Sequence, residues 1–112
     1  MALQCFYSCY GENENISSSN PITIDRKNAL YFFEQKVTAN KDFIGFVDHK
    51  GNTLQIMMEE DKSYWVELPY PEEEGSYGKR TSTEDISSLL GSLPLIFEKE
   101  KFPDFEFNSW QG

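Results

Sequence analysis

Histidine and cysteine are scarce in this chain, which limits the chemistry that its side chains can perform. The 112 residues include one histidine, His49, and two cysteines, Cys5 and Cys9, without CxxC spacing. A zinc site usually draws four ligands from such residues, so we expect no metal site and no cofactor. In a strand, Cys5 and Cys9 would lie roughly 13 Å apart on one face, beyond the Cα separation of about 7 Å that a disulfide allows. We therefore expect two reduced thiols, which is typical of a cytoplasmic protein.

Positive charge and long apolar runs are also lacking. The chain has 10 basic and 19 acidic residues, and its net charge is −9. This balance argues against direct binding of nucleic acid and against adsorption on anionic membranes. No stretch approaches the roughly 20 apolar residues of a membrane span, and Met1 is not followed by the pattern of a secretory signal. The charge favours cationic partners, although an acidic surface can also serve solubility alone.

Aromatic residues and alternating apolar residues are plentiful, and they predict one folded domain over residues 1–112. Aromatics make up 15% of the chain. Apolar periodicity predicts an α+β fold in the order β-α-β-β-β-α-β, a mainly antiparallel sheet with two helices packed on it. The expected strands are residues 3–9, 42–48, 53–59, 63–68 and 102–110, and the expected helices are 24–40 and 82–93.

Several local signals set the expected boundaries. Asp25 can cap the first helix and Asn40 can end it, and a loop is expected over residues 11–21. Ser82 and Asp85 stand at capping-box spacing before the second helix. Pro69 is expected to stop the pairing of the preceding strand. A shaped loop, "EEEGSYG" at residues 72–78, then leads towards the second helix.

Seven acids and only one base lie between residues 56 and 74, interleaved with tyrosine and tryptophan. Each acidic run can be a solvated surface, a docking surface for a basic partner, or a catalytic or calcium-binding group. Tyrosine anchors surrounded by charges are typical of protein interfaces. Trp65 can belong to that surface or pack beneath a helix. The candidate partner-binding residues are Glu59, Glu60, Asp61, Tyr70, Glu72, Glu73, Glu74 and Tyr77.

His49 is the main candidate for enzymatic chemistry. It could act with nearby carboxylates, as in a small hydrolase. However, it falls in "VDHKGN", which reads as a hairpin turn, and adjacent exposed carboxylates lack the desolvated cleft that separates the pKa values of catalytic pairs. We therefore expect that this protein is not an enzyme. An acidic adaptor domain for another basic protein is a third hypothesis.

Residues 43–94 resemble small bacterial immunity proteins of contact-dependent growth inhibition and other polymorphic toxin systems. The resemblance is carried by "FIGFVDHKGNTLQ", then by "YWVELP", and then by "GSYGK" before a short helix that ends in "LGSLP". It implies a non-enzymatic inhibitor that binds the C-terminal toxin domain of a neighbouring cell's delivery protein. Such toxins are often basic nucleases, so the resemblance implies that a ribonuclease active site is blocked by the acidic surface.

Overall fold

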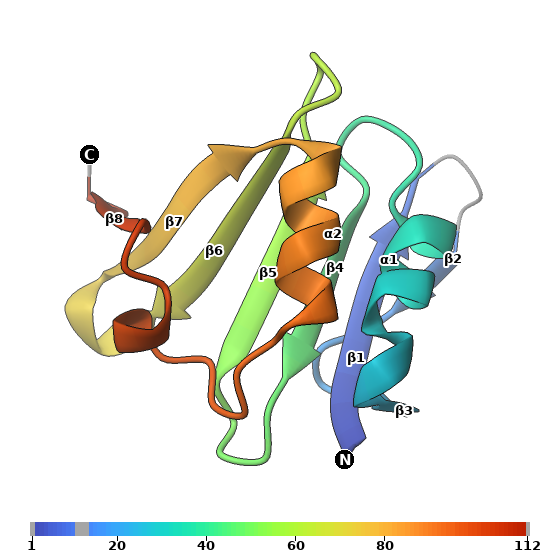
Figure 1. Cartoon of the computed structure of the whole chain (residues 1–112), viewed down its shortest axis with the longest axis horizontal. Helices are drawn as coiled ribbons and strands as arrows, with labels where there is room; N and C mark the ends of the chain where they lie inside the picture. The colour runs from blue at the N-terminus through green and yellow to red at the C-terminus, as the bar shows by residue number, and fades with distance from the viewer. Residues whose placement is uncertain (1, 11–13, 112) are drawn as a thin grey trace.

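The computed structural model describes residues 2–10 and 14–111 as an α+β fold. Antiparallel strands form one sheet in the order β2-β1-β4-β5-β6-β7-β8, and β3 pairs with the same strand as β2. Both α-helices cover one face of this sheet (Figure 1), which confirms the predicted fold class. The strands are β1 (Ala2–Cys9), β2 (Glu14–Ile16), β3 (Ile22–Asp25), β4 (Phe43–Val47), β5 (Thr53–Met58), β6 (Tyr64–Tyr70), β7 (Gly75–Thr81) and β8 (Glu106–Ser109). The helices are α1 (Ala29–Lys36) and α2 (Thr83–Gly91), with short 3-10 turns η1 (Arg26–Asn28), η2 (Pro71–Glu73) and η3 (Lys99–Lys101).

The core lies between the sheet and the two helices. Strands β5 and β6 alternate between buried and half-buried residues, as their sequence period of two predicts. The helices contribute Phe33 from α1 and Ile86 and Leu90 from α2. Complete burial of a side chain such as Ile86 stabilises the fold by about 1.5–3 kcal/mol.

The first helix is shorter than residues 24–40, and that prediction was wrong at both ends. Ile22–Asp25 forms β3, because Ile24 is buried opposite Leu3 of β1. Asp25 does act as a cap, but it accepts the backbone N–H of Lys27 at the start of η1. At the other end, the buried Asp42 carboxylate accepts the N–H groups of residues 38 and 39, so these amides are withdrawn from the helix. The left-handed residue that follows is Lys41, with φ of 73°, and not Asn40.

The predicted loop at residues 11–21 also holds a strand, β2, paired with the end of β1. Residues 11–13 lie outside the described part of the chain. The predicted last strand, 102–110, is reduced to β8, because Phe102 turns into the core and stacks on Phe105, with ring centroids 4.9 Å apart.

The stretch after residue 68 is a hairpin. Residues 72–74 lie in its turn, as predicted, but residues 75–78 belong to β7, so the predicted loop over 72–78 was wrong in its second half. Strand β6 continues through Pro69, which pairs with Ser76 of β7. Proline removes only one donor from the ladder, so its neighbours still pair. The turn is made by η2 and by Glu74, whose φ of 54° is left-handed. Ser82 then caps α2 by accepting the N–H of Asp85, as predicted.

Candidate functional site

The two predicted acidic groups lie at opposite ends of strand β6. Residues 59–61 belong to the β5–β6 turn, and residues 72–74 belong to the β6–β7 hairpin turn. The seven residues of β6 separate them by about 20 Å, at about 3.3 Å per residue. In Figure 1 the two turns stand at different edges of the molecule. The predicted residues therefore form two acidic surfaces.

The first acidic surface comprises Glu59, Glu60 and Asp61. Glu60 and Asp61 are exposed, and Glu59 contacts Arg80 of β7 at 4.0 Å. The Ser63 hydroxyl and backbone N–H both bond to the Asp61 carboxylate, which lowers its pKa. Together with Asn40 and Lys41, these residues line a shallow hollow of about 350 Å³. This surface can attract cations, and the bonds from Ser63 to Asp61 fix the conformation of its turn.

Three predicted site residues in the second group contact one another and Lys99. The Lys99 ammonium lies 3.2 Å from Glu73 Oε2 and 3.2 Å from the Tyr77 hydroxyl. Tyr77 donates to Glu73 Oε1 at 2.8 Å, and the Lys99 N–H donates to the Tyr70 hydroxyl at 2.8 Å. The Tyr77 hydroxyl and then Lys99 lower the pKa of Glu73, and the same contacts raise the pKa of Lys99. We call these four residues the Lys99 cluster.

The Lys99 cluster fixes the C-terminal segment against the hairpin. Glu72 and Glu74 lie beside it with exposed side chains. Neither is in an ion pair of the described residues, whereas Glu73 pairs with Lys99 and its side chain retains 35% of its exposure. The available acidic surface at this end is consequently smaller than the sequence indicates.

The side chains considered for enzymatic chemistry are dispersed. His49 is exposed in the β4–β5 turn, as expected. Cys5 and Cys9 are buried thiols on the helix-facing side of β1; burial raises the pKa of Cys5 to about 12, and Cys9 Sγ donates to the carbonyl of Lys36. Within residues 2–10 and 14–111, His, Cys, Asp and Glu do not gather in a group of three that could hold a metal ion.

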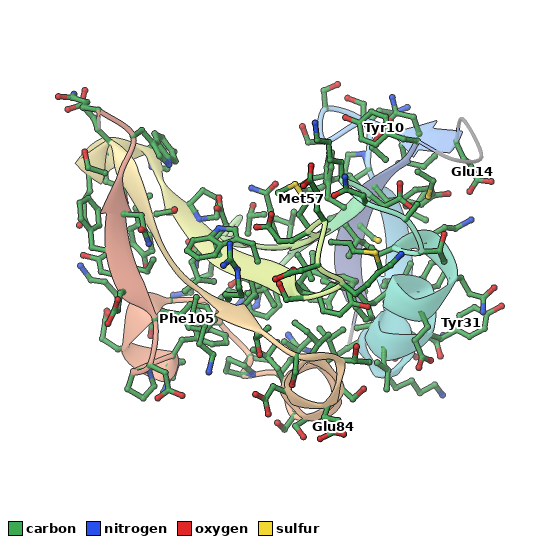
Figure 2. The ribbon with its side chains drawn as sticks, turned by 90° about the horizontal axis from the view of Figure 1, so that it is seen from above. Tyr10, Glu14, Tyr31, Met57, Glu84 and Phe105 are labelled. Atoms are coloured by element: carbon green, nitrogen blue, oxygen red, sulfur yellow. The ribbon has the colours of Figure 1, made fainter. Side chains whose placement is uncertain are left out.

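The sheet face opposite the helices has a concave shape that the sequence did not reveal. Figure 2 shows that this face is concave, with Met57 pointing into it. Register places Phe43, Met57 and Trp65 side by side in one cross-strand row. Trp65 therefore lies on the face away from the helices and does not pack beneath one. We call this surface the open face. The alternation along β5 and β6 in the sequence indicates that Met57 and Trp65 each lie on the face opposite the core residues of their strand. Only the strand register shows that they are neighbours and that Phe43 lies beside them.

Two glycines leave room for aromatic rings on the open face. A Cβ at Gly45 would be 2.1 Å from Cζ of Phe6, so the Phe6 ring occupies that space. A Cβ at Gly78 would be 3.0 Å from Cζ2 of Trp65 and 2.5 Å from a β6 carbonyl oxygen. The rings consequently cover backbone that would otherwise be exposed.

No helix in the described ranges has both the length and the apolar character needed to cross a membrane. Comparisons with protein-family models, with curated proteins and with solved structures each gave no match for this chain. The candidate site is thus defined by its own geometry: two acidic turns and a concave, aromatic open face.

Proposed function

We propose that this protein is an immunity protein, which binds a cognate toxin domain and neutralises it. The observation that carries the proposal is a surplus of exposed carboxylates at the two turns that flank β6. Ion pairs in the described part of the chain involve five carboxylates, and Glu60, Asp61, Glu72 and Glu74 are not among them. Such a surplus attracts a cationic protein and accelerates its association.

The proposed mechanism is steric and electrostatic. A nuclease toxin carries basic side chains where it binds phosphates. Carboxylates of the acidic turns would occupy those positions, and the body of the inhibitor would exclude the nucleic acid. A basic nuclease domain is the target that this charge fits, and we propose a ribonuclease; neutralisation would take place in the cytoplasm, where the toxin acts on nucleic acid.

Neither alternative is favoured by a specific contact. An enzyme using His49 would need carboxylates converging on that side chain, and His49 stands exposed in a turn. An adaptor domain would have the same acidic surface as an immunity protein, but it would not bind a toxin.

The test uses the toxin domain encoded immediately upstream. The purified proteins are mixed, the dissociation constant is measured by calorimetry, and toxin activity is measured with and without the protein. We expect a tight one-to-one complex and loss of toxin activity. Absence of a complex, or a complex that leaves toxicity undiminished, would overturn the proposed function.

A further inference from the structure

The open face contains a small hollow with apolar walls and one carboxylate. Its volume is about 150 Å³, and it is lined by Phe43, Gln55, Ile56, Met57, Trp65 and Glu67. A cavity of about this size holds a benzene molecule, so it can receive one large side chain. Because the hollow opens on the concave side of the sheet, an occupant can enter from a docked protein.

Strand register explains why the hollow has this composition. Met57 lies opposite both Phe43 and Trp65, and Gln55 lies opposite Glu67 in the next row. Neighbouring positions of that second row are Gly45 and Gly78, whose missing side chains leave room for the rings of Phe6 and Trp65. The amide and the carboxylate consequently lie beside the apolar row.

The carboxylate in the hollow is already oriented. Trp65 donates its indole N–H to Glu67 Oε1 at 2.5 Å. Each carboxylate oxygen has about two acceptor sites, so Glu67 can still accept bonds from a ligand. An apolar slot that ends at a held carboxylate is complementary to a side chain with an apolar stem and a cationic tip.

The wider charge of the open face is of the same sign. Alternation and register place Glu59, Glu67 and Glu106 on this face together with Arg80, and Lys41 lies beside Glu59 and Arg80 at its edge. Arg80 is itself in contact with Glu59 at 4.0 Å. The face therefore favours a cationic occupant over an anionic or purely apolar one.

We infer that this hollow receives an arginine side chain of the toxin domain. The arginine stem packs against Phe43 and Met57, its guanidinium plane stacks on the Trp65 ring, and its N–H groups donate to Glu67. Arginine suits the site better than lysine, because its planar guanidinium both stacks on aromatic rings and donates two parallel bonds to a carboxylate. This inference rests on the proposed function for the source of the arginine.

Two variants test the hollow within the complex. Glu67→Gln keeps the shape and an oxygen that can accept the Trp65 indole N–H, but it removes the charge. Trp65→Ala removes the stacking surface. Matched controls are Glu34→Gln, an exposed acid on α1, and Trp110→Ala, an exposed tryptophan. With the upstream toxin domain, we expect Glu67→Gln and Trp65→Ala to raise the dissociation constant on the order of tenfold or more, and the controls to leave it unchanged.

A second measurement does not depend on the toxin and identifies the side chain. The chain has two tryptophans, so the indole N–H resonance of Trp65 can be followed by NMR with Trp110 as an internal control. N-acetyl-arginine amide is titrated in, and N-acetyl-citrulline amide serves as the neutral isostere. We expect the arginine compound to shift the Trp65 resonance saturably in the native protein and not in Glu67→Gln. Equal shifts with both compounds, or no shift with either, would overturn the inference.

The outcomes separate the two proposals. If the toxin domain binds the native protein and Glu67→Gln binds equally well, the hollow is not the contact and the proposed function stands. If the native protein does not bind the toxin domain, the proposed function fails, and the toxin is excluded as the source of the arginine.

Discussion

Asp48 is a buried carboxylate that holds two segments of the chain together at the end of β4. Its oxygens accept the N–H groups of Lys50 and Asn52 in the β4–β5 turn, and that of Phe97 from the segment after α2, at 2.9, 2.9 and 2.7 Å. Burial alone would raise the pKa of Asp48, but these hydrogen bonds outweigh burial and hold the pKa below its ordinary value. The carboxylate thereby fixes the turn that carries His49.

Replacing Asp48 by asparagine should destabilise the protein by about 1–3 kcal/mol, because a charge-assisted acceptor of buried N–H groups is lost. The folded pKa is lowered, so the stability from this ionised group is present above about pH 4 and is lost as the pH falls through the folded pKa. Urea unfolding at several pH values measures this. The difference between the native protein and Asp48→Asn should shrink below about pH 4.

The matched control is Asp104→Asn, which removes an exposed ion pair with Lys79. Exposed pairs contribute about 0–1 kcal/mol, so this variant should unfold almost like the native protein. Equal losses in the two variants would contradict the structural role assigned to Asp48.

At the scale of elements, the β6–β7 hairpin and the C-terminal segment form one unit through the Lys99 cluster. Tyr70 and Tyr77 pack edge to face with ring centroids 5.2 Å apart, and Tyr77 also contacts Phe107 of β8 at 5.2 Å. Strand β8 pairs with β7, and its four residues are exposed. Pairing with β7 and the Lys99 cluster, more than burial of the β8 side chains, hold this edge of the sheet.

Replacing Tyr70 by phenylalanine removes the acceptor of the Lys99 backbone N–H and keeps the ring. One neutral hydrogen bond contributes about 1 kcal/mol. Hydrogen exchange of the Lys99 amide should therefore accelerate several-fold, up to on the order of tenfold. Tyr31→Phe, at an exposed tyrosine of α1, is the control. Unchanged exchange at Lys99 would show that the segment is held by other contacts.

The elements show which parts of this structure a sequence can predict. The alternation of β5 and β6 and the Ser82 cap depend on near neighbours, and both predictions were confirmed. The end of α1 depends on Asp42 and the strand at Pro69 depends on pairing with Ser76, so local patterns placed both wrongly. In the Lys99 cluster, Lys99 contacts partners that precede it by 22 to 29 positions in the sequence. No local signal in one sequence encodes such a pairing.

At the scale of the whole molecule, the acidic surplus is divided between separate surfaces. The net charge of −9 acts at long range, whereas the turns act on contact. In the proposed binding mode, the net charge attracts the partner over long distances, and the concave open face then binds it. Sequence could indicate the charge, but the curvature of the sheet follows from the twist and pairing of its strands.

Reversing one exposed acid at each turn, Glu60→Lys with Glu72→Lys, should slow association with the toxin domain at low salt. Stopped-flow measurements at increasing salt should show this difference shrinking, because exposed charges are screened beyond about 8 Å at physiological ionic strength. The control is Glu34→Lys with Glu84→Lys, which carries the same net charge and alters the helix side seen in Figure 2. Equal slowing in both variants would assign the effect to net charge and not to the turns.

The most direct test of the central claim is a map of backbone amide chemical shifts in the isotopically labelled protein, with and without the unlabelled upstream toxin domain. We expect changes concentrated in the β5–β6 and β6–β7 turns and at the open-face residues Phe43, Met57, Trp65 and Glu67, with α1 and α2 unaffected. Changes confined to the helices, or no changes at all, would contradict it.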